Sequence, residues 1–325
     1  MKLEGATLAV TGIGGFIGQR VAERARDRGM RVRGLDQSKD AAERARAAGF
    51  EVLAGDVCDA GATSALCAGA DVVIHTAAVV REDGPRELYD RVNVGGSERV
   101  ARSARAAGVR RFVHLSSVMV YGFTYPPLVT EDGPLRGEGN PYCETKIESE
   151  KVVRAQHEAG KFEVTVIRPG DVYGAGSGPW VVRPFDLMKA GLFILPGGGK
   201  GIVNHVYVDN LVDAIFLAIE QDASDVYTVT DGIGATCLDY FRPIAQAAGR
   251  PRIRTAPAGL LRATFTAVQA AATLVGLEAP AAPSAVDYLM RPHAYSNAKA
   301  RRDLGFVPAV DFSEGMRRVA AWLAR

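Results

Sequence analysis

The stretch ATLAVTGIGGFIGQR, residues 6–20, decides the fold of this 325-residue chain. It begins as an apolar run of β-forming residues, passes through closely spaced glycines and leads into a helical pattern. Gly12, Gly15 and Gly18 give the spacing G-x-x-G-x-x-G. Glycines at such positions permit a tight turn, a close backbone approach and close helix–strand packing. The strand–turn–helix context therefore predicts a dinucleotide-binding unit whose helix N-terminus faces a pyrophosphate.

Strands and helices alternate through the first half of the chain. The segment RVRGLD at 31–36 is expected as the second strand, and a helix is expected at 39–48. Further strands are expected at 50–56, 71–78, 110–117 and 163–170. This order predicts a parallel sheet with helices on both faces, and the continuous apolar runs suit strands buried on both sides. We therefore expect an α/β fold built on a Rossmann-type doubly wound parallel sheet.

The end of the second expected strand predicts which dinucleotide binds. Asp36 lies there, about 20 residues after the glycine turn, where a carboxylate accepts hydrogen bonds from the adenosine ribose and repels a 2′-phosphate. This favours NAD over NADP. The preference is not absolute, because the cationic residues Arg33 and Lys39 lie nearby in the sequence. Asp56 after the third strand has two equal interpretations, an adenine contact or a strand-end cap. The small residues of HTAA, 75–78, allow a close approach to the cofactor, and His75 itself is expected to be structural.

Regular alternation weakens after residue 170. Gly- and Pro-rich stretches follow, and order returns at 204–220 and 225–231. We expect an NAD-binding domain comprising residues 1–170 and 204–231. A smaller, mostly C-terminal α/β substrate-binding portion is expected from residues 171–203 and 232–325, interwoven with the NAD-binding domain. Most of the substrate specificity is expected from 171–205 and 255–295.

Composition excludes several classes of protein. Apolar residues make up 47% of the chain and charged residues 23%, with a net charge of +2 and no basic tract, so no nucleic-acid partner is expected. Four cysteines and five histidines are scattered without ligand spacing, which predicts no metal site and fits a reducing cytoplasm. The start MKLEGATLAVTG runs into a strand pattern rather than a signal peptide. We expect a cytoplasmic protein without an integral membrane segment.

The segment PYCETKIESEK, residues 141–151, carries a candidate catalytic pair. Tyr142 and Lys146 lie one helical turn apart on one face. The pair is either a chance aromatic–cation contact on an exposed helix or a phenol kept reactive by an ammonium group. A free tyrosine has a pKa of about 10, so a neighbouring positive charge that favours phenolate would be needed for base catalysis at neutral pH.

Taken together, the motifs resemble the extended short-chain dehydrogenase/reductase superfamily, the NAD-dependent epimerase/dehydratase family. The resemblance covers most of residues 1–215. Its motifs are, in chain order, TGIGGFIG, GDVCD, HTAA, RVNVGG, LSSVMVYG, Y-x-x-x-K, IRPGDVYG and VYVDN.

The resemblance implies roles for individual residues. Tyr142 would be the general acid/base, and Lys146 would tune it and hold the nicotinamide ribose. Ser117, five residues before Gly122, would hydrogen-bond the reacting oxygen, a register that Ser116 fits less well. The cofactor-binding residues expected from the motifs and the resemblance are Gly12, Gly15, Phe16, Ile17, Gly18, Asp36, Asp56, Val57, Thr76, Ala77, Ala78, Asn93, Tyr142, Lys146, Pro169 and Val172. For Asn93, a structural role competes with a proton relay.

Residues after Ser117 narrow the reaction. The resemblance implies that dehydratases and decarboxylases of the family place carboxylates there, whereas this chain has Val118 and Met119, which cannot transfer protons. Two reactions remain: oxidation or reduction of a secondary alcohol/ketone, and C4 epimerisation through a transient ketone. The segments HTAAVVREDGP and YSNAKARRDLGFVP resemble the 3β-hydroxysteroid dehydrogenase-like branch.

The substrate remains open between two chemistries. An apolar helix is expected near 259–277; core packing is its expected role, and a sterol-like alcohol would suit a cleft built partly from it. Arg252, Arg254 and Arg291 keep a sugar-nucleotide 4-epimerase open, because a diphosphate needs cationic groups. A non-catalytic nucleotide-sensing protein is the third interpretation. The helices around 86–107 and 140–159 resemble those of a four-helix dimer interface, so a homodimer is expected.

Overall fold

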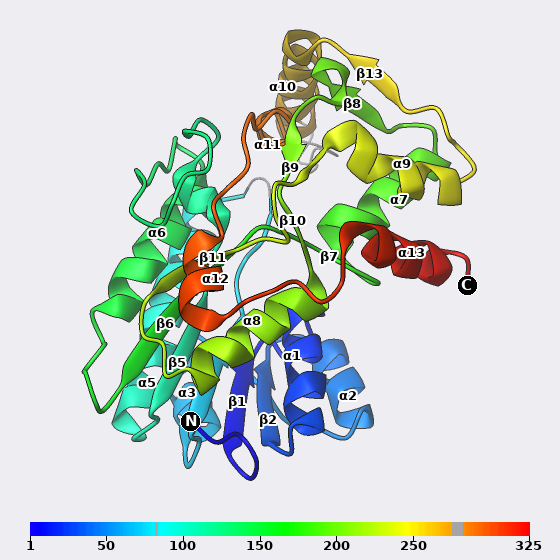
Figure 1. The fold of residues 1–325 in the computed structure, drawn as a ribbon. Coiled ribbons are helices and arrows are strands. Elements are labelled where there is room, and N and C mark those ends of the chain that lie inside the picture. The colour runs from blue at the N-terminus through cyan, green and yellow to red at the C-terminus, as the bar shows by residue number, and fades with distance from the viewer. Residues whose placement is uncertain (82–83, 275–281) are drawn as a thin grey trace.

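A seven-stranded parallel sheet forms the centre of the molecule. The computed structural model describes residues 1–81, 84–274 and 282–325 (Figure 1). The strand order is β11-β6-β5-β4-β1-β2-β3, and every pairing in this sheet is parallel. The strands are β1 (Thr7–Thr11), β2 (Arg31–Asp36), β3 (Glu51–Ala54), β4 (Val72–His75), β5 (Arg111–Leu115), β6 (Glu163–Pro169) and β11 (Val226–Val229). The predicted parallel sheet is confirmed.

The order in which strands are added to the sheet reverses between β1 and β4, and this switch point indicates where a ligand binds. The chain proceeds from β1 outward through β2 to β3, then returns to pair β4 on the other side of β1. Thr11, the last residue of β1, aligns with Leu35 on one side and His75 on the other. Ligands bind outside the carboxyl ends of the strands at such a switch point. The predicted glycine turn begins there, at Gly12.

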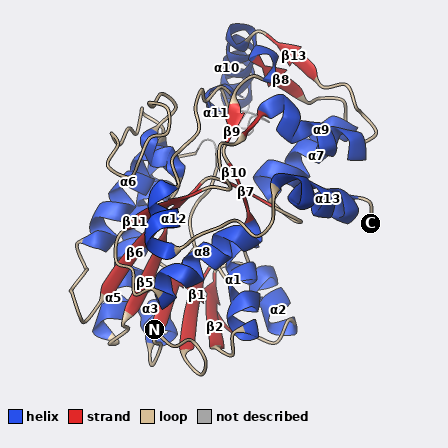
Figure 2. Cartoon of the chain, viewed as in Figure 1, coloured by secondary structure: helices blue, strands red, loops and turns tan. Residues whose placement is uncertain are grey.

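Helices cover both faces of the sheet (Figure 2). Leu8 and Val10 pack into one apolar core and Ala9 into the other, as the two-residue side-chain period of a strand requires. The helices of the first core are α1 (Phe16–Asp27), α2 (Lys39–Ala47), α8 (Val208–Glu220) and α12 (Ala298–Leu304). Those of the second core are α3 (Ala60–Cys67), α5 (Ser97–Ala106) and α6 (Pro141–Arg154). The doubly wound arrangement is therefore confirmed.

A second group of elements lies beyond the carboxyl edge of the sheet (Figure 1). Its strand pairs are β7 (Asp171–Tyr173) with β10 (His205–Tyr207), β9 (Ile202–Val203) with β12 (Ala235–Thr236), and β8 (Ile194–Pro196) with β13 (Arg254–Ala256). Its helices are α7 (Arg183–Lys189), α9 (Cys237–Ala247), α10 (Ala258–Leu274), α11 (Ser284–Leu289) and α13 (Phe312–Leu323). An aromatic core that includes Tyr173, Tyr240 and Phe241 holds much of this group together. The division at 1–170 with 204–231 stays a prediction.

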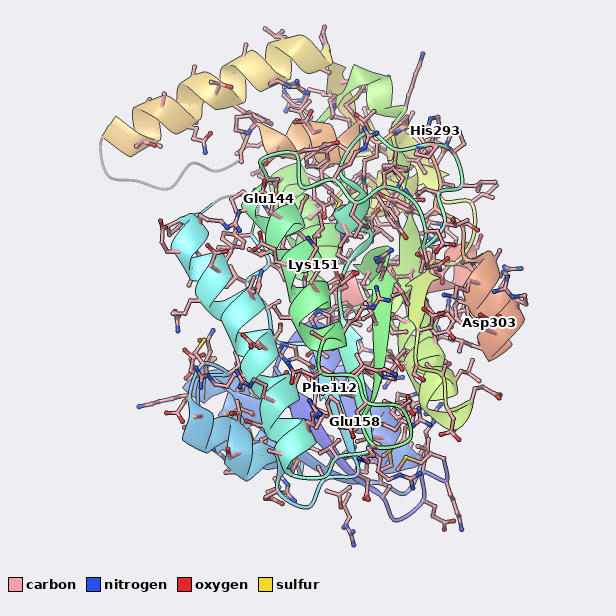
Figure 3. All side chains as sticks on the ribbon, turned by 90° about the vertical axis from the view of Figure 1, so that its left-hand side faces the viewer. Phe112, Glu144, Lys151, Glu158, His293 and Asp303 are labelled. Carbon is pink, nitrogen blue, oxygen red and sulfur yellow. The ribbon has the colours of Figure 1, made fainter. Side chains whose placement is uncertain are left out.

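The predicted core packing of the apolar helix is wrong for the part that the structure describes. In α10, Leu261 is buried, but 61% of Leu260 and 38% of Val268 are exposed. The helix extends away from the body of the molecule (Figure 3). Its apolar character comes largely from alanine, whose small side chain offers little surface to bury. Residues 275–277 of the predicted helix, and 278–281 of the segment after it, lie outside the described residues. Among the described helices, none is long and apolar enough to cross a membrane.

Candidate active site

The glycine turn is built so that helix α1 packs directly against it. Gly12 has φ +68°, a conformation that glycine adopts without strain. A Cβ on Gly12 would also lie 3.2 Å from the backbone of Ala77, after β4. A Cβ on Gly18 would lie 2.1 Å from the carbonyl oxygen of Gly12, which no real side chain tolerates. These contacts explain the glycines at both positions and leave a smooth backbone cradle at the switch point.

The cradle fits a dinucleotide phosphate. Gly15 is the N-cap of α1 and contributes no side chain, so the first-turn N–H groups, including those of Phe16 and Ile17, have no side-chain cap. Such groups bind anions well. Asp36 at the end of β2 accepts hydrogen bonds from the N–H of Gly14 at 2.9 Å and of Ser38 at 3.0 Å. Its carboxylate is thereby fixed beside the glycine turn, where a ribose would lie.

Asp56 has partners of its own within the chain. Its carboxylate accepts a 2.9 Å hydrogen bond from the N–H of Cys58 and pairs with the guanidinium of Arg91, also at 2.9 Å. Burial opposes the charged form, but these two contacts outweigh it and lower the pKa of Asp56. The geometry supports the strand-end cap more directly than an adenine contact. The neighbouring Val57 is buried against Gly96, where a Cβ would come within 2.8 Å.

Residues that follow β4 are anchored to the end of β1. The hydroxyl of Thr76 donates to the carbonyl of Thr11 at 2.7 Å, and the N–H of Ala77 donates to the Thr11 hydroxyl at 3.3 Å. This positions the segment through Ala78 next to the cradle. His75 contacts the hydroxyls of Thr11 and Ser97 at 2.7 and 2.9 Å. Burial lowers the pKa of His75 to about 3, so the ring is neutral and its role is structural.

Asn93 connects the segment after β4 to the helix that carries Tyr142. Its side-chain oxygen accepts from the N–H of Val79 at 2.7 Å, and its amide donates to the Val79 carbonyl at 3.2 Å and to Thr145 at 3.3 Å. It lies in a π-helical segment, η1 (Asp90–Gly96), which interrupts the helix expected at 86–107 after a short α4 (Arg86–Tyr89). These contacts support the structural interpretation of Asn93.

Helix α6 places the predicted catalytic residues together. Its N-cap, Asn140, accepts hydrogen bonds from the N–H groups of Tyr142 at 3.0 Å and Cys143 at 3.1 Å, which fixes where the helix begins. The Ser117 side chain, two residues beyond the end of β5, lies next to the phenol of Tyr142 and favours its ionised form. The ammonium of Lys146 lies 5.9 Å from the centre of the Tyr142 ring. Sequence-distant Ser117 thus meets the tyrosine–lysine pair at the carboxyl edge of the sheet.

Burial controls the ionisation of this group. It raises the pKa of Tyr142 to about 12, although the neighbouring Ser117 side chain acts in the opposite direction. It lowers the pKa of Lys146 to about 8, against the attraction of Glu150. The sequence-based expectation of a lowered tyrosine pKa is therefore not met in this structure, because the cost of burying a phenolate outweighs the nearby positive charge. The tyrosine is protonated at neutral pH.

Ser116 and Ser117 have different hydrogen-bond partners. Its hydroxyl donates a 2.5 Å hydrogen bond to Glu150, which also forms a buried ion pair with Arg168 at 2.7 Å. The Ser117 hydroxyl accepts from the N–H of Met119 at 3.1 Å and meets Tyr142. This arrangement supports the choice of Ser117 over Ser116 as the residue facing the reacting oxygen.

Pro169 and Val172 lie where the main sheet passes into the second group of elements. Pro169 ends β6, and Val172 pairs with Val206 between β7 and β10. Between them, a Cβ on Gly170 would lie 2.1 Å from the carbonyl oxygen of Asn204. The backbone here is therefore closely packed, and its position beside the switch point is set by the two short strands.

Next to the start of α6 lies a cavity of about 470 Å³ that sequence reasoning missed. Phe123 and Tyr288 pack with Tyr142 in one apolar cluster, and their ring centres lie 5.9 Å apart. The cavity is lined by Gly84, Phe123, Thr124, Glu138, Gly139, Asn140, Pro141, Gln269, Ala282, Pro283, Ser284 and Asp287. The lining residues from Gln269 to Asp287 fall in the 255–295 stretch expected to carry specificity, whereas those from Gly84 to Pro141 have no local sequence signal.

The three arginines suggested for a diphosphate do not converge. Arg291 is fully buried. Its guanidinium donates a hydrogen bond to the carboxylate of Asp171 at 2.5 Å and another to the carbonyl of Tyr288 at 2.9 Å. Its charge is therefore neutralised within the chain. Arg252 and Arg254 are exposed, and Arg254 begins β13. Within residues 1–81, 84–274 and 282–325, no cluster of three metal-ligating side chains is present.

The fold and the site define a class of protein: a dinucleotide-binding α/β enzyme with a Ser–Tyr–Lys group at the switch point of its sheet. Residues 8–230 match the profile of the NAD dependent epimerase/dehydratase family. The chain belongs to this family and is an enzyme of the extended short-chain dehydrogenase/reductase type.

Known relatives include dehydrogenases, reductases and epimerases. A Mycobacterium tuberculosis 3 beta-hydroxysteroid dehydrogenase/Delta 5→4-isomerase is 32% identical, with 92% of this chain and 85% of that protein covered. A Stenotrophomonas maltophilia 2-alkyl-3-oxoalkanoate reductase is 30% identical, covering 97% and 98%. The crystal structure of Thermus thermophilus UDP-glucose 4-epimerase in complex with NAD superposes with a TM-score of 0.78 at 23% identity, covering 98% of each chain. At that identity the structural likeness shows the fold alone.

Proposed function

We propose that this protein is an NAD-dependent oxidoreductase that moves a hydride between nicotinamide and a secondary alcohol or ketone, with Tyr142 as the general acid/base. The observation that carries the proposal is the placement of the Ser117 side chain next to the Tyr142 phenol, with the ammonium of Lys146 5.9 Å from the Tyr142 ring centre. The relatives named hydroxysteroid dehydrogenase and oxoalkanoate reductase support this type of reaction. The aromatic wall beside Tyr142 supports an apolar, sterol-like substrate.

The mechanism follows from the side chains. When bound, NAD supplies the carbon that gives or takes the hydride. In reduction, the Tyr142 hydroxyl donates its proton to the carbonyl oxygen as that oxygen gains negative charge. The Ser117 hydroxyl hydrogen-bonds the same oxygen, and Lys146 holds positive charge nearby to stabilise the tyrosinate that remains. In oxidation the same groups act in reverse, and Tyr142 accepts the alcohol proton.

NAD is the cofactor that the described residues suit best. The uncapped N–H groups of α1 would hold the pyrophosphate, and Asp36 would accept hydrogen bonds from the adenosine ribose. A 2′-phosphate would meet the Asp36 carboxylate, which disfavours NADP. Lys146 would hold the nicotinamide ribose, as in the family that the sequence resembles.

A sugar-nucleotide 4-epimerase with tightly bound NAD is the alternative. The fold permits it, as the epimerase structure shows. However, Arg291 forms a buried ion pair with Asp171, and the other two candidate arginines, Arg252 and Arg254, are exposed. These three arginines therefore do not gather into a site that would recognise a substrate diphosphate. A nucleotide sensor without catalysis is less well supported, because the complete Ser117, Tyr142 and Lys146 set is present.

Cofactor retention distinguishes the two reactions. The protein is purified without added nucleotide, denatured, and its released NAD(H) and NADP(H) are quantified. A dehydrogenase exchanges its cofactor in every cycle, whereas a 4-epimerase regenerates it and need not release it. Little retained nucleotide, with exchangeable micromolar binding of NAD, is expected. Near-stoichiometric retained NAD would instead favour the epimerase, and turnover of nucleotide sugars would then decide.

Two further expectations remain proposals. We expect the protein to act in the cytoplasm, and we expect a homodimer formed through α5 and α6. Those two helices pack side by side on one face of the sheet. Their outward residues include the exposed Arg102 and Lys151, so such an interface would rely on charged as well as apolar contacts (Figure 3).

A further inference from the structure

We propose that the cavity beside Tyr142 selects uncharged secondary alcohols and ketones over carboxylate-bearing ones, and that Glu138 and Asp287 impose this selectivity. The inference rests on the proposed function and adds the charge class of the substrate. It starts from the composition of the cavity wall, where the two side chains that carry charge are both acidic among the lining residues that the structure describes. An anion in this cavity of about 470 Å³ would lie among lining residues that include both carboxylates.

The first carboxylate is held firmly in place. Glu138 adopts φ +54°, an unusual backbone conformation for a residue with a side chain. Its carboxylate accepts a 3.0 Å hydrogen bond from the N–H of Phe123, whose ring forms part of the cavity wall. A Cβ on the neighbouring Gly122 would lie 2.6 Å from the other carboxylate oxygen. Glu138 is thus packed against the loop that lines the cavity, and its negative charge has a defined position.

The second carboxylate comes from α11, on the other side of the cavity. Asp287 forms an ion pair with Arg262 of α10, which partly offsets its charge. Burial nevertheless raises the pKa of Asp287, with Glu138 adding to the effect against the attraction of Arg262. The influence of Glu138 on Asp287 shows that the two carboxylates act on the same region. Arg262 itself is half exposed and is not among the lining residues.

The cavity adjoins the start of the helix that carries Tyr142. Asn140 and Pro141 line the cavity and directly precede Tyr142, whose ring packs with Phe123. A carboxylate within a few bonds of the reacting carbon would enter the region between Glu138 and Asp287. Like charges brought together in a partly buried site repel one another, and the ion pair of Asp287 with Arg262 offsets only part of this repulsion. An ester or a hydrocarbon at the same position carries no such penalty.

A matched pair of probes tests this inference. Methyl 3-hydroxydecanoate and 3-hydroxydecanoate share the reacting alcohol and differ at the carboxyl group two bonds from the carbinol carbon, which is charged in the acid and carries a neutral methyl ester in the other probe. Their affinities for the NAD-loaded protein are measured by isothermal titration calorimetry at low ionic strength. We expect the ester to bind at least about tenfold more tightly than the acid, from repulsion between like charges. Equal affinities, or tighter binding of the acid, would overturn the proposal.

Two substitutions assign the selectivity to named residues. Glu138→Gln keeps an oxygen that accepts from Phe123, and Asp287→Asn is nearly isosteric, so each removes charge with little change of shape. Each should reduce the ester-to-acid affinity ratio by about threefold or more, and the double variant by more. Asp27→Asn, an exposed carboxylate at the end of α1, is the control and should leave the ratio unchanged. An unchanged ratio in the double variant, with an unaltered circular dichroism spectrum, would refute the assignment.

Failure of this inference is distinguishable from failure of the proposed function, because binding and turnover are read separately. If the ester is preferred but neither probe nor any other alcohol yields NADH, the cavity selectivity stands and the oxidoreductase proposal fails. If both probes bind equally and both are oxidised, the oxidoreductase stands and the selectivity is refuted.

Discussion

The ammonium nitrogen of Lys146 lies 2.8 Å from the carbonyl oxygen of Leu115, the last residue of β5. This hydrogen bond ties the catalytic helix to the edge of the sheet directly before the Ser116–Ser117 pair. Lys146 is buried, and burial lowers its pKa to about 8. The lysine is therefore held in position by a neutral acceptor, and its charge costs stability in the folded protein.

Replacing Lys146 should raise the free energy of unfolding of the protein while lowering its enzymatic turnover. A shift of the pKa from 10.5 to about 8 corresponds to about 3 kcal/mol, and losing the bond to Leu115 returns about 1 kcal/mol. Lys146→Met should therefore raise the free energy of unfolding near pH 7 by about 2 kcal/mol. Because the folded-state pKa is lowered, this advantage should shrink as pH rises from about 8 to 10.5. Urea unfolding of both proteins across that range measures it; an advantage that grows with pH would contradict the assignment.

Removing the Tyr142 hydroxyl should abolish most of the turnover without unfolding the protein. The ring of Tyr142→Phe keeps its packing against Met119 and Tyr288, so thermal stability should change little. Loss of the general acid should lower kcat by about 100- to 10,000-fold with little effect on NAD affinity. Steady-state kinetics and a cofactor titration measure the two quantities. Ser117→Ala should give a smaller loss, and near-full turnover by Tyr142→Phe would refute the mechanism.

Gly18 should tolerate no side chain. Its Cβ would lie 2.1 Å from the Gly12 carbonyl oxygen, so Gly18→Ala must push α1 away from the turn. We expect a loss of about 1–3 kcal/mol in stability and a marked loss of NAD affinity. Gly259→Ala is the matched control, because nothing lies within 4 Å of the added Cβ, and its effect should stay below about 1 kcal/mol. Thermal unfolding with and without NAD separates the two variants, and equal effects would count against the close-packing explanation.

Cofactor preference should depend on Asp36. Asp36→Asn keeps an oxygen for the N–H of Gly14 but removes the charge that repels a 2′-phosphate. The ratio of NAD to NADP affinity should fall by about tenfold. Asp40→Asn, an exposed carboxylate in the first turn of α2, controls for the loss of one charge nearby. Fluorescence titration with both reduced cofactors gives the ratios; a fall of the same size in the control would show a general charge effect only.

The oligomeric state tests the α5–α6 interface. Light scattering after size exclusion at micromolar concentration should give twice the chain mass of 34.5 kDa. Lys151→Glu reverses an exposed charge on α6 and should weaken the dimer, whereas Lys161→Glu, exposed beyond the helix, should not. A monomeric mass for the unmodified protein would refute the expectation.

Local patterns in the sequence predicted the framework well. The strand RVRGLD coincides with β2, and the glycine turn begins directly after β1. Tyr142 and Lys146 share a helical face because the spacing of four residues fixes it. Even the structural role of His75 was predicted, from its place at the end of a buried strand. Such features depend on neighbours in the chain, so composition and periodicity suffice to find them.

Only the tertiary structure decided how charged side chains pair and which side chains are exposed. The pairing of Arg291 with Asp171 and the joint placement of Glu138 with Asp287 depend on segments that meet only in the fold. The exposure of α10 and the raised pKa of Tyr142 likewise reverse what the local pattern indicated. A pattern along the chain records which residues lie near one another in sequence, whereas burial and Coulomb energy depend on distances across the whole molecule. The sequence by itself therefore determined the scaffold and the proposed catalytic pair, and folding determined which charged side chains are neutralised within the chain and which line the cavity.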